Sequence, residues 1–471
     1  MDKRIWVENF LDRTKDQWFK TSDYIWDHPE IRFEEFESVR HLTSVLKGEE
    51  FDITEGLAGI ETAFVAEYGS GSPVIAFLGE YDALPNLSQK SGLTRQEAVD
   101  QGGHGHGCGH NLLGTGALAA AVTLKEYIKE HNLSGTVRFY GCPAEEGGSG
   151  KTFMAREGVF DGVDLAFTWH PAPVTGIWSF STLANIQAYF KFTGKSSHAA
   201  AAPHLGRSAL DAVELMNVGV NYLREHMIDD AKIHYAVTNT GGMSPNVVQA
   251  EAEVLQLIRA PQIDQARELF ERVKKIAEGA ALMTETEVEV IFDKACSNFI
   301  PNDVLNEVLD EAVTEIGPVR FTDEEFQLAK EFQNSLSKTE LASANMGIKA
   351  LDFALQKPLS DLAIPYFKTN QVLPGSTDVG DVSWITPTAQ VITSTVAVGT
   401  AFHTWQFVAQ GKTSYAKKGM LQAAKYLALA AVKALRDEQI IADAKLDLEN
   451  KLAGAKYVCP IPAEVKPNQS R

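Results

Sequence analysis

Short apolar runs that end in polar clusters recur along the first half of the chain. Residues 72–79 read Ser-Pro-Val-Ile-Ala-Phe-Leu-Gly, and residues 136–141 and 165–169 form similar runs. Continuous apolar runs of this length are typical of buried strands in an α/β sheet. Apolar positions at helical spacing occupy residues 4–48, and an Ala- and Leu-rich helix is expected over residues 115–131. The pattern predicts an α/β fold in which helices flank a sheet.

A different pattern begins near residue 185. Strand, helix, strand, strand, helix and strand are expected in that order, over residues 187–192, 207–225, 234–239, 246–258, 263–282 and 287–292. The order β-α-β-β-α-β with alternating strands is typical of a ferredoxin-like α+β domain. We therefore predict an inserted domain over residues 185–296, within a catalytic domain made of residues 1–184 and 297–471.

The last third of the chain returns to helices and one further strand. The β-branched run at residues 391–398 predicts a strand, and residues 417–435 predict a closing amphipathic helix. Residues 323–356 are polar and weakly patterned. We expect a mobile or family-variable insertion there.

Side chains that bind metals lie just after the predicted strands. Cys108 and His110 stand in a glycine-rich segment, Glu145 and Glu146 follow the second strand, and His170 follows the third. Binding crevices of open α/β sheets form outside the carboxyl ends of the strands, so we expect these groups to lie together. Thiolate and imidazole are good ligands for divalent metals, whereas a flexible linker would hold Ser and Thr between its glycines.

Each of these groups also has a simpler interpretation. A Glu-Glu pair is often a solvated acidic loop, and a histidine such as His170 is often a hydrogen-bonded core residue. Cys108 is either an inert buried thiol or a nucleophile with a histidine base. A hydrolytic metal centre needs one carboxylate as a ligand and another as a general base, which the adjacent Glu145 and Glu146 can supply.

The overall composition narrows the class of partners. The 471 residues include 43 Lys and Arg against 62 Asp and Glu, which gives a net charge of −19. This balance argues against nucleic-acid and anionic-membrane partners. The four cysteines form no CxxC pair, no apolar stretch approaches ~20 residues, and residues 1–20 carry no apolar signal segment. We expect a cytoplasmic protein.

Five motifs, in this order, resemble those of the M20 metallopeptidase family and fit best its amidohydrolase branch. They are Gly107-Cys108-Gly109-His110, Pro143-Ala144-Glu145-Glu146-Gly147-Gly148, Trp169-His170-Pro171, Gly194-Lys195-Ser196-Ser197-His198-Ala199 and Gly399-Thr400-Ala401-Phe402-His403. The likeness covers nearly the whole chain. It implies a zinc-exopeptidase-like catalytic domain with a mixed sheet, and an inserted domain that serves as lid and dimerisation domain.

The resemblance implies roles for residues in both domains. Glu145 would be the general base, and Asp82 would orient a ligand. The metal ligands would be Cys108, His110, Glu146, His170 and His403.

In the inserted domain, His198 would reach the active site of a partner chain and stabilise the developing oxyanion there. Asn246 and Arg259 would hold polar and carboxylate groups of the substrate. The simpler interpretations are a surface histidine, a turn-capping asparagine and a surface arginine.

The chain departs from the family pattern at the metal ligands. The amidohydrolase branch usually reads Cys-Gly-His-Asp-x-His, but Asn111 and Leu113 stand at the last two characteristic positions. Glu80 stands where two-metal peptidases place a ligand histidine. One ion or two, and Mn²⁺ or Zn²⁺, are therefore both compatible with the sequence.

The resemblance implies a metal-dependent amidohydrolase that cleaves an aryl- or acyl-amino acid, with an aryl-amide of glutamate expected. Hydrolysis of N-acyl-amino acids or dipeptides is the alternative within this class. Two alternatives from other classes are a cysteine hydrolase that uses Cys108 and a catalytically silent partner of an active enzyme. A homodimer, or a heterodimer with a related chain, is expected to form through the inserted domain.

Overall fold

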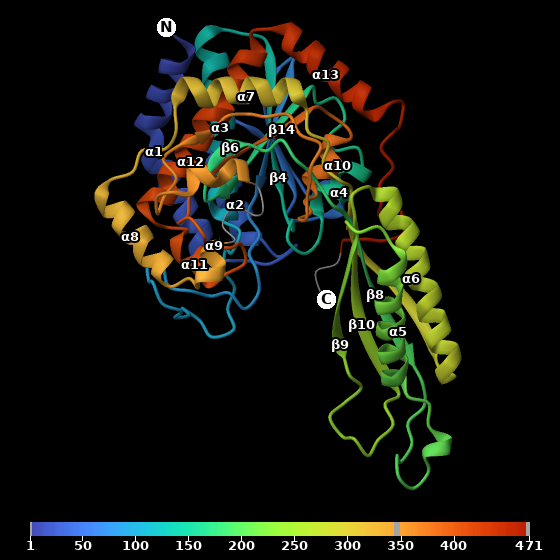
Figure 1. Ribbon diagram of the computed structural model, residues 1–471. Coiled ribbons are helices and arrows are strands. Elements are labelled where there is room, and N and C mark those ends of the chain that lie inside the picture. The colour runs from blue at the N-terminus through green and yellow to red at the C-terminus, as the bar shows by residue number, and fades with distance from the viewer. Residues whose placement is uncertain (1, 343–348, 468–471) are drawn as a thin grey trace.

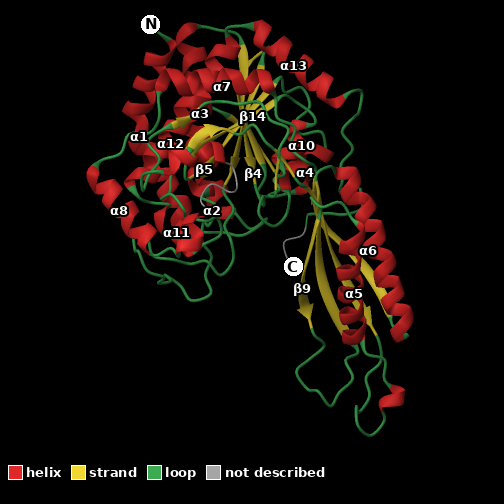
Figure 2. Ribbon diagram, in the orientation of Figure 1, coloured by secondary structure: helices red, strands yellow, loops and turns green. Residues whose placement is uncertain are grey.

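The chain folds into two units, each built around its own sheet (Figures 1 and 2). The computed structural model describes residues 2–342 and 349–467 of the 471. The larger unit combines the N-terminal and C-terminal parts of the chain, and the smaller one projects from its side. We call residues 184–296 the small-sheet unit.

The larger unit holds an eight-stranded sheet in the order β1-β2-β4-β3-β5-β14-β6-β12. Its central strands β4, β3, β5 and β14 are parallel, whereas β1, β2 and β6 pair antiparallel with their neighbours, which confirms the predicted mixed sheet. Its strands are β1 (Asp52–Glu55), β2 (Phe64–Ser70), β3 (Val74–Glu80), β4 (Gly135–Cys142), β5 (Leu165–Ala172), β6 (Thr175–Ile177), β12 (Ala363–Ile364) and β14 (Thr388–Ser394). A separate two-stranded sheet pairs β7 (Ser181–Thr182) with β13 (Val372–Leu373).

Helices flank this sheet and bury it, as the apolar pattern predicts (Figure 2). The Ala- and Leu-rich α3 and α12 pack against each other and against α1, and together they form much of the larger core. The α-helices are α1 (Lys3–Asp27), α2 (Phe36–Gly48), α3 (His110–His131), α4 (Gly150–Arg156), α7 (Asp303–Ile316), α8 (Asp323–Asn334), α9 (Lys338–Ala342), α10 (Val379–Ser383), α11 (Trp405–Gln410), α12 (Ser414–Leu435) and α13 (Glu438–Leu452). Among the described residues, no helix is long and apolar enough to cross a membrane.

The small-sheet unit has the predicted ferredoxin-like order of elements. Its four strands are antiparallel in the order β11-β8-β10-β9, and α5 and α6 pack on one face of them. The other face is open, because alternate residues of β10 are buried and half-exposed. The elements are β8 (Ala184–Thr193), α5 (Ala209–Leu223), β9 (Lys232–Asn239), β10 (Glu251–Ala260), α6 (Ile263–Thr284) and β11 (Glu287–Cys296).

Several predicted boundaries were wrong. Helix α3 begins at His110 rather than at residue 115, and strand β10 begins at Glu251 rather than at residue 246. The weakly patterned stretch 323–356, where an insertion was expected, contains the helices α8 and α9. Helix α8 starts with a capping box formed by Thr322 and Glu325. The part of that stretch at 343–348 lies outside the described residues.

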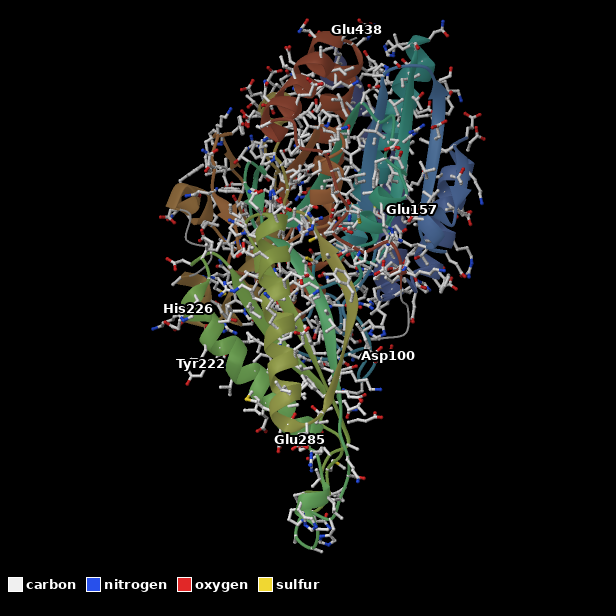
Figure 3. The ribbon with its side chains drawn as sticks, turned by 90° about the vertical axis from the view of Figure 1, so that its right-hand side faces the viewer. Asp100, Glu157, Tyr222, His226, Glu285 and Glu438 are labelled. Atoms are coloured by element: carbon white, nitrogen blue, oxygen red, sulfur yellow. The ribbon has the colours of Figure 1, made fainter. Side chains whose placement is uncertain are left out.

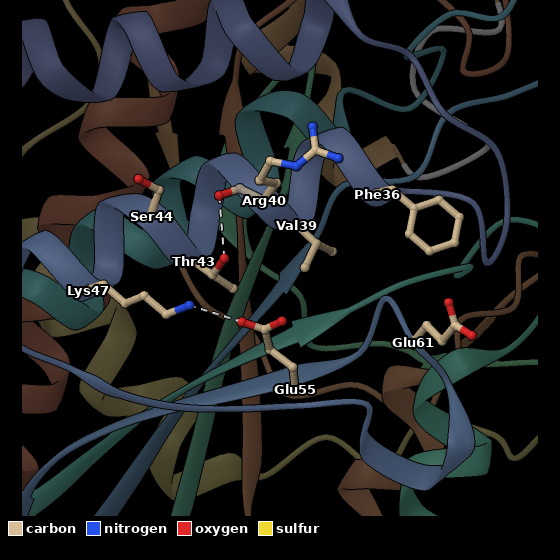
Figure 4. A pocket seen from close by; sticks show the side chains of 8 residues that line it. All are labelled: Phe36, Val39, Arg40, Thr43, Ser44, Lys47, Glu55 and Glu61. Atoms are coloured by element: carbon tan, nitrogen blue, oxygen red, sulfur yellow. Dashed lines mark hydrogen bonds and ion pairs between the residues drawn. The ribbon is translucent and has the colours of Figure 1, made fainter.

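A groove of about 500 Å³ lies along α2 (Figure 4). The ion pair between Lys47 Nζ and Glu55 Oε1, at 3.2 Å, crosses it. The groove shares no residue with the predicted site. Its lining consists of Phe36, Val39, Arg40, Thr43, Ser44, Lys47, Glu55 and Glu61.

Candidate metal centre

The predicted site lies where the parallel strands of the larger sheet end. Glu80 is the last residue of β3, His170 is near the end of β5, and Glu145 and Glu146 follow β4. His403 lies nine residues after the end of β14. Since these strands are parallel neighbours, their carboxyl ends bring the five residues to one edge of the sheet.

Two glycines bring the Cys108 segment to the same edge. Gly109 adopts a left-handed conformation with φ 77° and caps the start of α3, so that His110 is the first helical residue. A Cβ at Gly114 would lie 2.4 Å from the carbonyl oxygen of Glu80. Only glycine therefore lets α3 lie this close to the end of β3, which places His110 Nε2 3.3 Å from Glu80 Oε2.

The five predicted metal ligands converge in two overlapping groups. Cys108 Sγ lies 3.6 Å from His170 Nε2, and Glu146 Oε2 lies 3.2 Å from His403 Nε2. Within each group the ligand atoms lie within 4.8 Å of one another, and Cys108 belongs to both groups. The groups are Cys108, His110 and His170, and Cys108, Glu146 and His403.

This donor set fits divalent metal ions. Two atoms bound to one ion at about 2.0–2.3 Å lie about 3.3–3.8 Å apart when the ligands are arranged tetrahedrally. The Cys108–His170 distance of 3.6 Å falls in this range, and the Glu146–His403 distance of 3.2 Å lies just below it. His110 Nε2 is buried and has no hydrogen-bond partner among the described residues, as expected of an atom that faces a metal ion.

Carbonyl and carboxylate oxygens fix the orientation of the histidines. His110 Nδ1 lies 2.9 Å from Asp82 Oδ1, and the other oxygen of Asp82 accepts the backbone N–H of Glu146 at 2.9 Å. His170 Nδ1 lies 2.7 Å from the carbonyl oxygen of Pro171. Such partners would hold each ring with Nε2 toward a metal ion, which is the role that the family resemblance implies for Asp82.

The turn that carries the two glutamates is strained and firmly held. Ala144 has φ 59°, an uncommon conformation for a residue with a side chain, and its carbonyl accepts the N–H of Gly148 at 2.8 Å. Glu35 Oε1 accepts the N–H groups of both Ala144 and Phe33 at 2.9 Å. Glu35 is fully buried, and no local feature of the sequence points to its contact with Ala144, 109 residues away.

The adjacent glutamates differ in their electrostatic environment. Burial, together with the Glu80 and Glu146 carboxylates, raises the pKa of Glu145 well above its usual range. Although burial acts in the opposite direction, the contact with His403 lowers the pKa of Glu146 to about 2. An ionised ligand therefore stands beside a group whose proton affinity suits a general base.

A buried lysine that the sequence analysis missed balances the negative charge. Lys151 Nζ lies 2.7 Å from Glu80 Oε1 and 2.5 Å from Asp378 Oδ1, and all three side chains are almost inaccessible to solvent. The Lys151 N–H also donates to Asp378 Oδ2 at 2.8 Å. One oxygen of Glu80 thus binds an ammonium group while the other faces His110.

Of the predicted substrate residues, only Arg259 lies near the centre. Its Nη1 atom lies 3.4 Å from Pro374 O and from Ser376 Oγ. Burial lowers the pKa of Arg259, and the nearby Cys296 and Glu145 act against that shift.

His198 and Asn246 lie together at the opposite end of the small-sheet unit. The N–H of Ala199 donates to the Asn246 carbonyl at 2.9 Å, and His198 pairs with Val247. His198 is exposed and lies beyond Thr193, the residue that ends β8. Because eight residues of extended strand separate Thr193 from Asn185, which pairs with Arg259, this tip lies about 26 Å beyond Arg259. The structure does not bring His198 or Asn246 to the metal centre of the same chain.

Residues 76–322 match the family model "Peptidase family M20/M25/M40". The chain is also 50% identical to a subunit of the p-aminobenzoyl-glutamate hydrolase of Escherichia coli K12, with 98% of each chain covered. The chain belongs to the M20 family. The other subunit of that hydrolase is 30% identical over 240 residues, which cover 48% of this chain and 54% of the relative.

A solved structure shares the fold. A dinuclear metal-binding peptidase of the M20 family from Bacillus subtilis aligns with a TM-score of 0.58 at 19% identity, and the alignment covers 90% of this chain and 99% of that one. The assignment to the M20 family from motifs is confirmed, and so is the likeness to the amidohydrolase branch. The chain is a metal-dependent amidohydrolase.

The alternative in which Cys108 acts as a nucleophile finds no support at the site. Burial and the Glu146 carboxylate raise the pKa of the Cys108 thiol well above its usual range. An activated cysteine nucleophile requires the opposite shift.

Proposed function

We propose that this amidohydrolase cleaves the amide bond between an aromatic acyl group and glutamate, with p-aminobenzoyl-glutamate as the substrate. The observation that carries this proposal is the 50% identity, over 98% of both chains, to a subunit of the hydrolase named for that compound. Arg259 near Glu145 supports it, because a guanidinium group binds a carboxylate in bidentate fashion.

We propose that the two overlapping donor groups, both of which contain Cys108, would hold two divalent ions of zinc or manganese. A bound ion supplies Lewis acidity, which polarises a carbonyl group and makes water more acidic. Thiolate and imidazole suit zinc, and the carboxylate and imidazole groups suit manganese. Asp82 keeps His110 and the Glu146 segment in place for either ion.

In the proposed mechanism Glu145 moves the proton. It takes a proton from the attacking water and delivers it to the amine nitrogen when the amide bond breaks. Burial and the Glu80 carboxylate raise the pKa of Glu145, which makes it a stronger proton acceptor than an ordinary carboxylate. Arg259 holds the carboxylate of the glutamate moiety next to that base.

We propose that the small-sheet unit is a lid that also joins the chain to a second one. In this proposal His198 and Asn246 serve the active site of that partner, which accounts for their position at the far tip. Helix α5 presents an exposed apolar strip on the outside of the unit, where Tyr222 lies (Figure 3), and strand β9 exposes two further large apolar side chains. The exposed residues are Leu215, Val218, Tyr222, Tyr235 and Val237.

Such a strip is typical of a protein–protein interface. The partner in question is either a second copy of this chain or a related chain. The E. coli hydrolase supports the second choice, because two of its subunits are both similar to this chain.

We also propose a cytoplasmic location. The four cysteines are all unpaired, and Cys108, Cys142 and Cys296 are buried. A reducing compartment preserves such thiols.

The proposal is tested with purified protein under Zn²⁺ and under Mn²⁺, assayed alone and with a homologue of the less similar E. coli relative. The substrate panel contains p-aminobenzoyl-glutamate, hippurate, an N-acetyl-amino acid and a dipeptide. We expect the first compound to have the highest kcat/KM. Preferential cleavage of a dipeptide or an N-acetyl-amino acid would replace the proposed substrate, and turnover only with the added partner would assign this chain a dependent role.

A further inference from the structure

Strand β11 contains an extra residue at the point where it approaches the metal centre. Phe292 pairs with Ala188 of β8 and Lys294 pairs with Gln187, so Asp293 has no partner in the register. This is a β-bulge, which turns the neighbouring side chains and is common beside active sites. The bulge places Lys294 on the open face of the small sheet.

Arg259 and Asn185 lie on that same face. Arg259 pairs with Asn185 of β8, Asn185 pairs with Cys296 of β11, and Lys294 is two residues from Cys296. Side chains directly opposite each other, and those two residues apart on a strand, share a face. Arg259 and Lys294 are two strands apart, so their Cβ atoms lie about 12 Å from each other and the two long side chains can meet one small ligand.

Both cations lie at the metal centre. Lys294 is 8% exposed, and its Nζ donates to the carbonyl oxygen of Glu146 at 3.1 Å. Arg259 lies near Glu145. The two cations of the open face therefore lie next to the turn that carries Glu145 and Glu146.

Neither cation has an anionic partner in the part of the chain that the structure describes. Lys294 bonds to one carbonyl oxygen, and Arg259 bonds only to the neutral Pro374 O and Ser376 Oγ at 3.4 Å. A buried ammonium group is stable only when an anion compensates its loss of hydration. Asn185, between them, also has a buried Oδ1 without a hydrogen bond.

A neighbouring arginine provides the contrast. Arg32 also reaches the turn that carries Glu145 and Glu146, where its Nη1 atom donates to the carbonyl of Gly147. Arg32, however, forms an ion pair with Asp293, in which Nη2 lies 3.1 Å from Oδ1. The bulge thus supplies a carboxylate to Arg32 and leaves Lys294 without one.

We propose that Lys294 binds the side-chain carboxylate of the glutamate moiety while Arg259 binds its α-carboxylate. Every N-acyl-amino acid has an α-carboxylate, so Arg259 would bind all of them. Only a dicarboxylic amino acid also has a side-chain carboxylate, so Lys294 would be the residue that selects it. A glutamine side chain has the same shape as glutamate without the charge, and it would leave the ammonium group unpaired. This inference rests on the proposed function and adds the residue that determines its specificity.

The test compares p-aminobenzoyl-glutamate with p-aminobenzoyl-glutamine, using metal-loaded wild type, Lys294→Met and Arg259→Met. We expect wild type to prefer the glutamate compound by about 100-fold or more in kcat/KM, because a site built for a charged group rejects its neutral analogue. Lys294→Met should lose about 100-fold on the glutamate compound, mainly through KM, and change little on the glutamine compound. Arg259→Met should weaken both compounds alike.

Two results would overturn the inference. The first is a wild type that accepts glutamine as readily as glutamate. The second is a Lys294→Met variant that loses the same factor on both compounds, which would show that Lys294 only supports the Glu146 segment. Metal content and Tm of the variant identify a folding defect, and Lys294→Arg, which keeps the charge, should then retain most of the glutamate preference.

A binding measurement separates this inference from the proposed function. Calorimetry with free glutamate and free glutamine on the metal-loaded wild type needs no turnover. If the enzyme hydrolyses neither compound, either alone or with the added partner chain, the proposed substrate is wrong. A glutamate preference that Lys294→Met abolishes would still support the role of Lys294, and equal binding of the two amino acids would reject it.

Discussion

The metal centre and the open face of the small sheet differ in the partners of their buried cations. At the centre the buried Lys151 is paired with two carboxylates, those of Glu80 and Asp378. On the open face, Lys294 and Arg259 meet only neutral oxygen atoms in the described structure. The proposed metal ligands and the proposed general base therefore all come from one chain, whereas the two cations of the open face bond only to neutral oxygen atoms among the described residues.

The same contrast separates two positions of histidine. His110 is buried, His170 is half-buried, and their Nδ1 atoms are held by Asp82 and by the Pro171 carbonyl. His198 is exposed, and its ring bonds only to the N–H groups of Ala200 and Ala201. The first kind of histidine serves its own chain, and the second has the position expected of a group offered to a partner.

The largest effect should come from Glu145→Gln. Because this change removes the only proposed proton carrier, kcat should fall about 10³-fold on any accepted amide. Metal content, measured by elemental analysis, should stay at the wild-type value because Glu145 is not one of the five proposed ligands. The exposed Glu157 provides a matched control, Glu157→Gln, which should retain full activity. Normal turnover in Glu145→Gln would remove Glu145 from the mechanism.

The next largest effect should come from His198→Ala, at about 100-fold in kcat, if a partner receives this histidine. An equal mixture of the His198→Ala and Glu145→Gln variants should recover activity that neither has alone, because a mixed dimer contains one intact site. His204→Ala, in the same exposed tip, should lose nothing. A mixture as inactive as its two components would show that His198 does not act between copies of this chain.

Asp82→Asn should weaken metal binding about 10- to 100-fold, because the amide holds His110 less firmly and presents one oxygen in place of two. Competition with a coloured chelator measures this affinity directly. Asp100→Asn, on the surface in Figure 3, is the matched control. Unchanged affinity in Asp82→Asn would mean that the two contacts of Asp82 do not support the ligands.

The smallest effect is expected at Glu35. Its variants test whether the turn before Glu145 is stabilised by the hydrogen bonds that Glu35 accepts or by the charge of its carboxylate. Glu35→Gln keeps the oxygen that accepts the N–H groups of Phe33 and Ala144, so the free energy of unfolding should change by less than about 1 kcal/mol. Glu35→Ala leaves both N–H groups unpaired and should cost about 3 kcal/mol. Equal losses in the two variants would contradict the role of the accepted bonds.

The pH dependence of Glu35 has a definite sign. Burial, with Asp82 nearby, raises its pKa in the folded protein well above the usual 4.5. The folded state then holds a proton that the unfolded state has released, so this group favours folding below pH 4.5 and loses that contribution as the pH rises. Between about pH 5 and pH 8 the Tm of wild type should therefore fall relative to that of Glu35→Gln. A constant difference between the two would reject the raised pKa.

Much of the fold and the ligand set could be predicted because their signals are local. Apolar strands followed at once by Glu145, Glu146 or His170 show both the sheet and the edge where these groups meet. The start of α3 was predicted five residues late, since a run of glycines suggests a loop even where Gly109 begins a helix.

The supporting residues could not be predicted, because their partners are distant in sequence. Lys151 and Asp378 are 227 residues apart, and nothing near either residue indicates the contact. The bulge at Asp293 depends on the register against β8, so an alternating pattern alone does not show on which face Lys294 lies. The family resemblance implied Arg259 as a substrate-binding residue, whereas nothing near Lys294 in the sequence points to the role proposed for it.

Stepwise removal of metal, with elemental analysis and activity measured on the same samples, tests the central claim most directly. The claim is that the two donor groups around Cys108 hold the ions on which turnover depends. We expect about two ions per chain in the active protein, a loss of activity in parallel with their removal, and recovery on addition of Zn²⁺ or Mn²⁺. Full turnover by a metal-free chain would contradict the account.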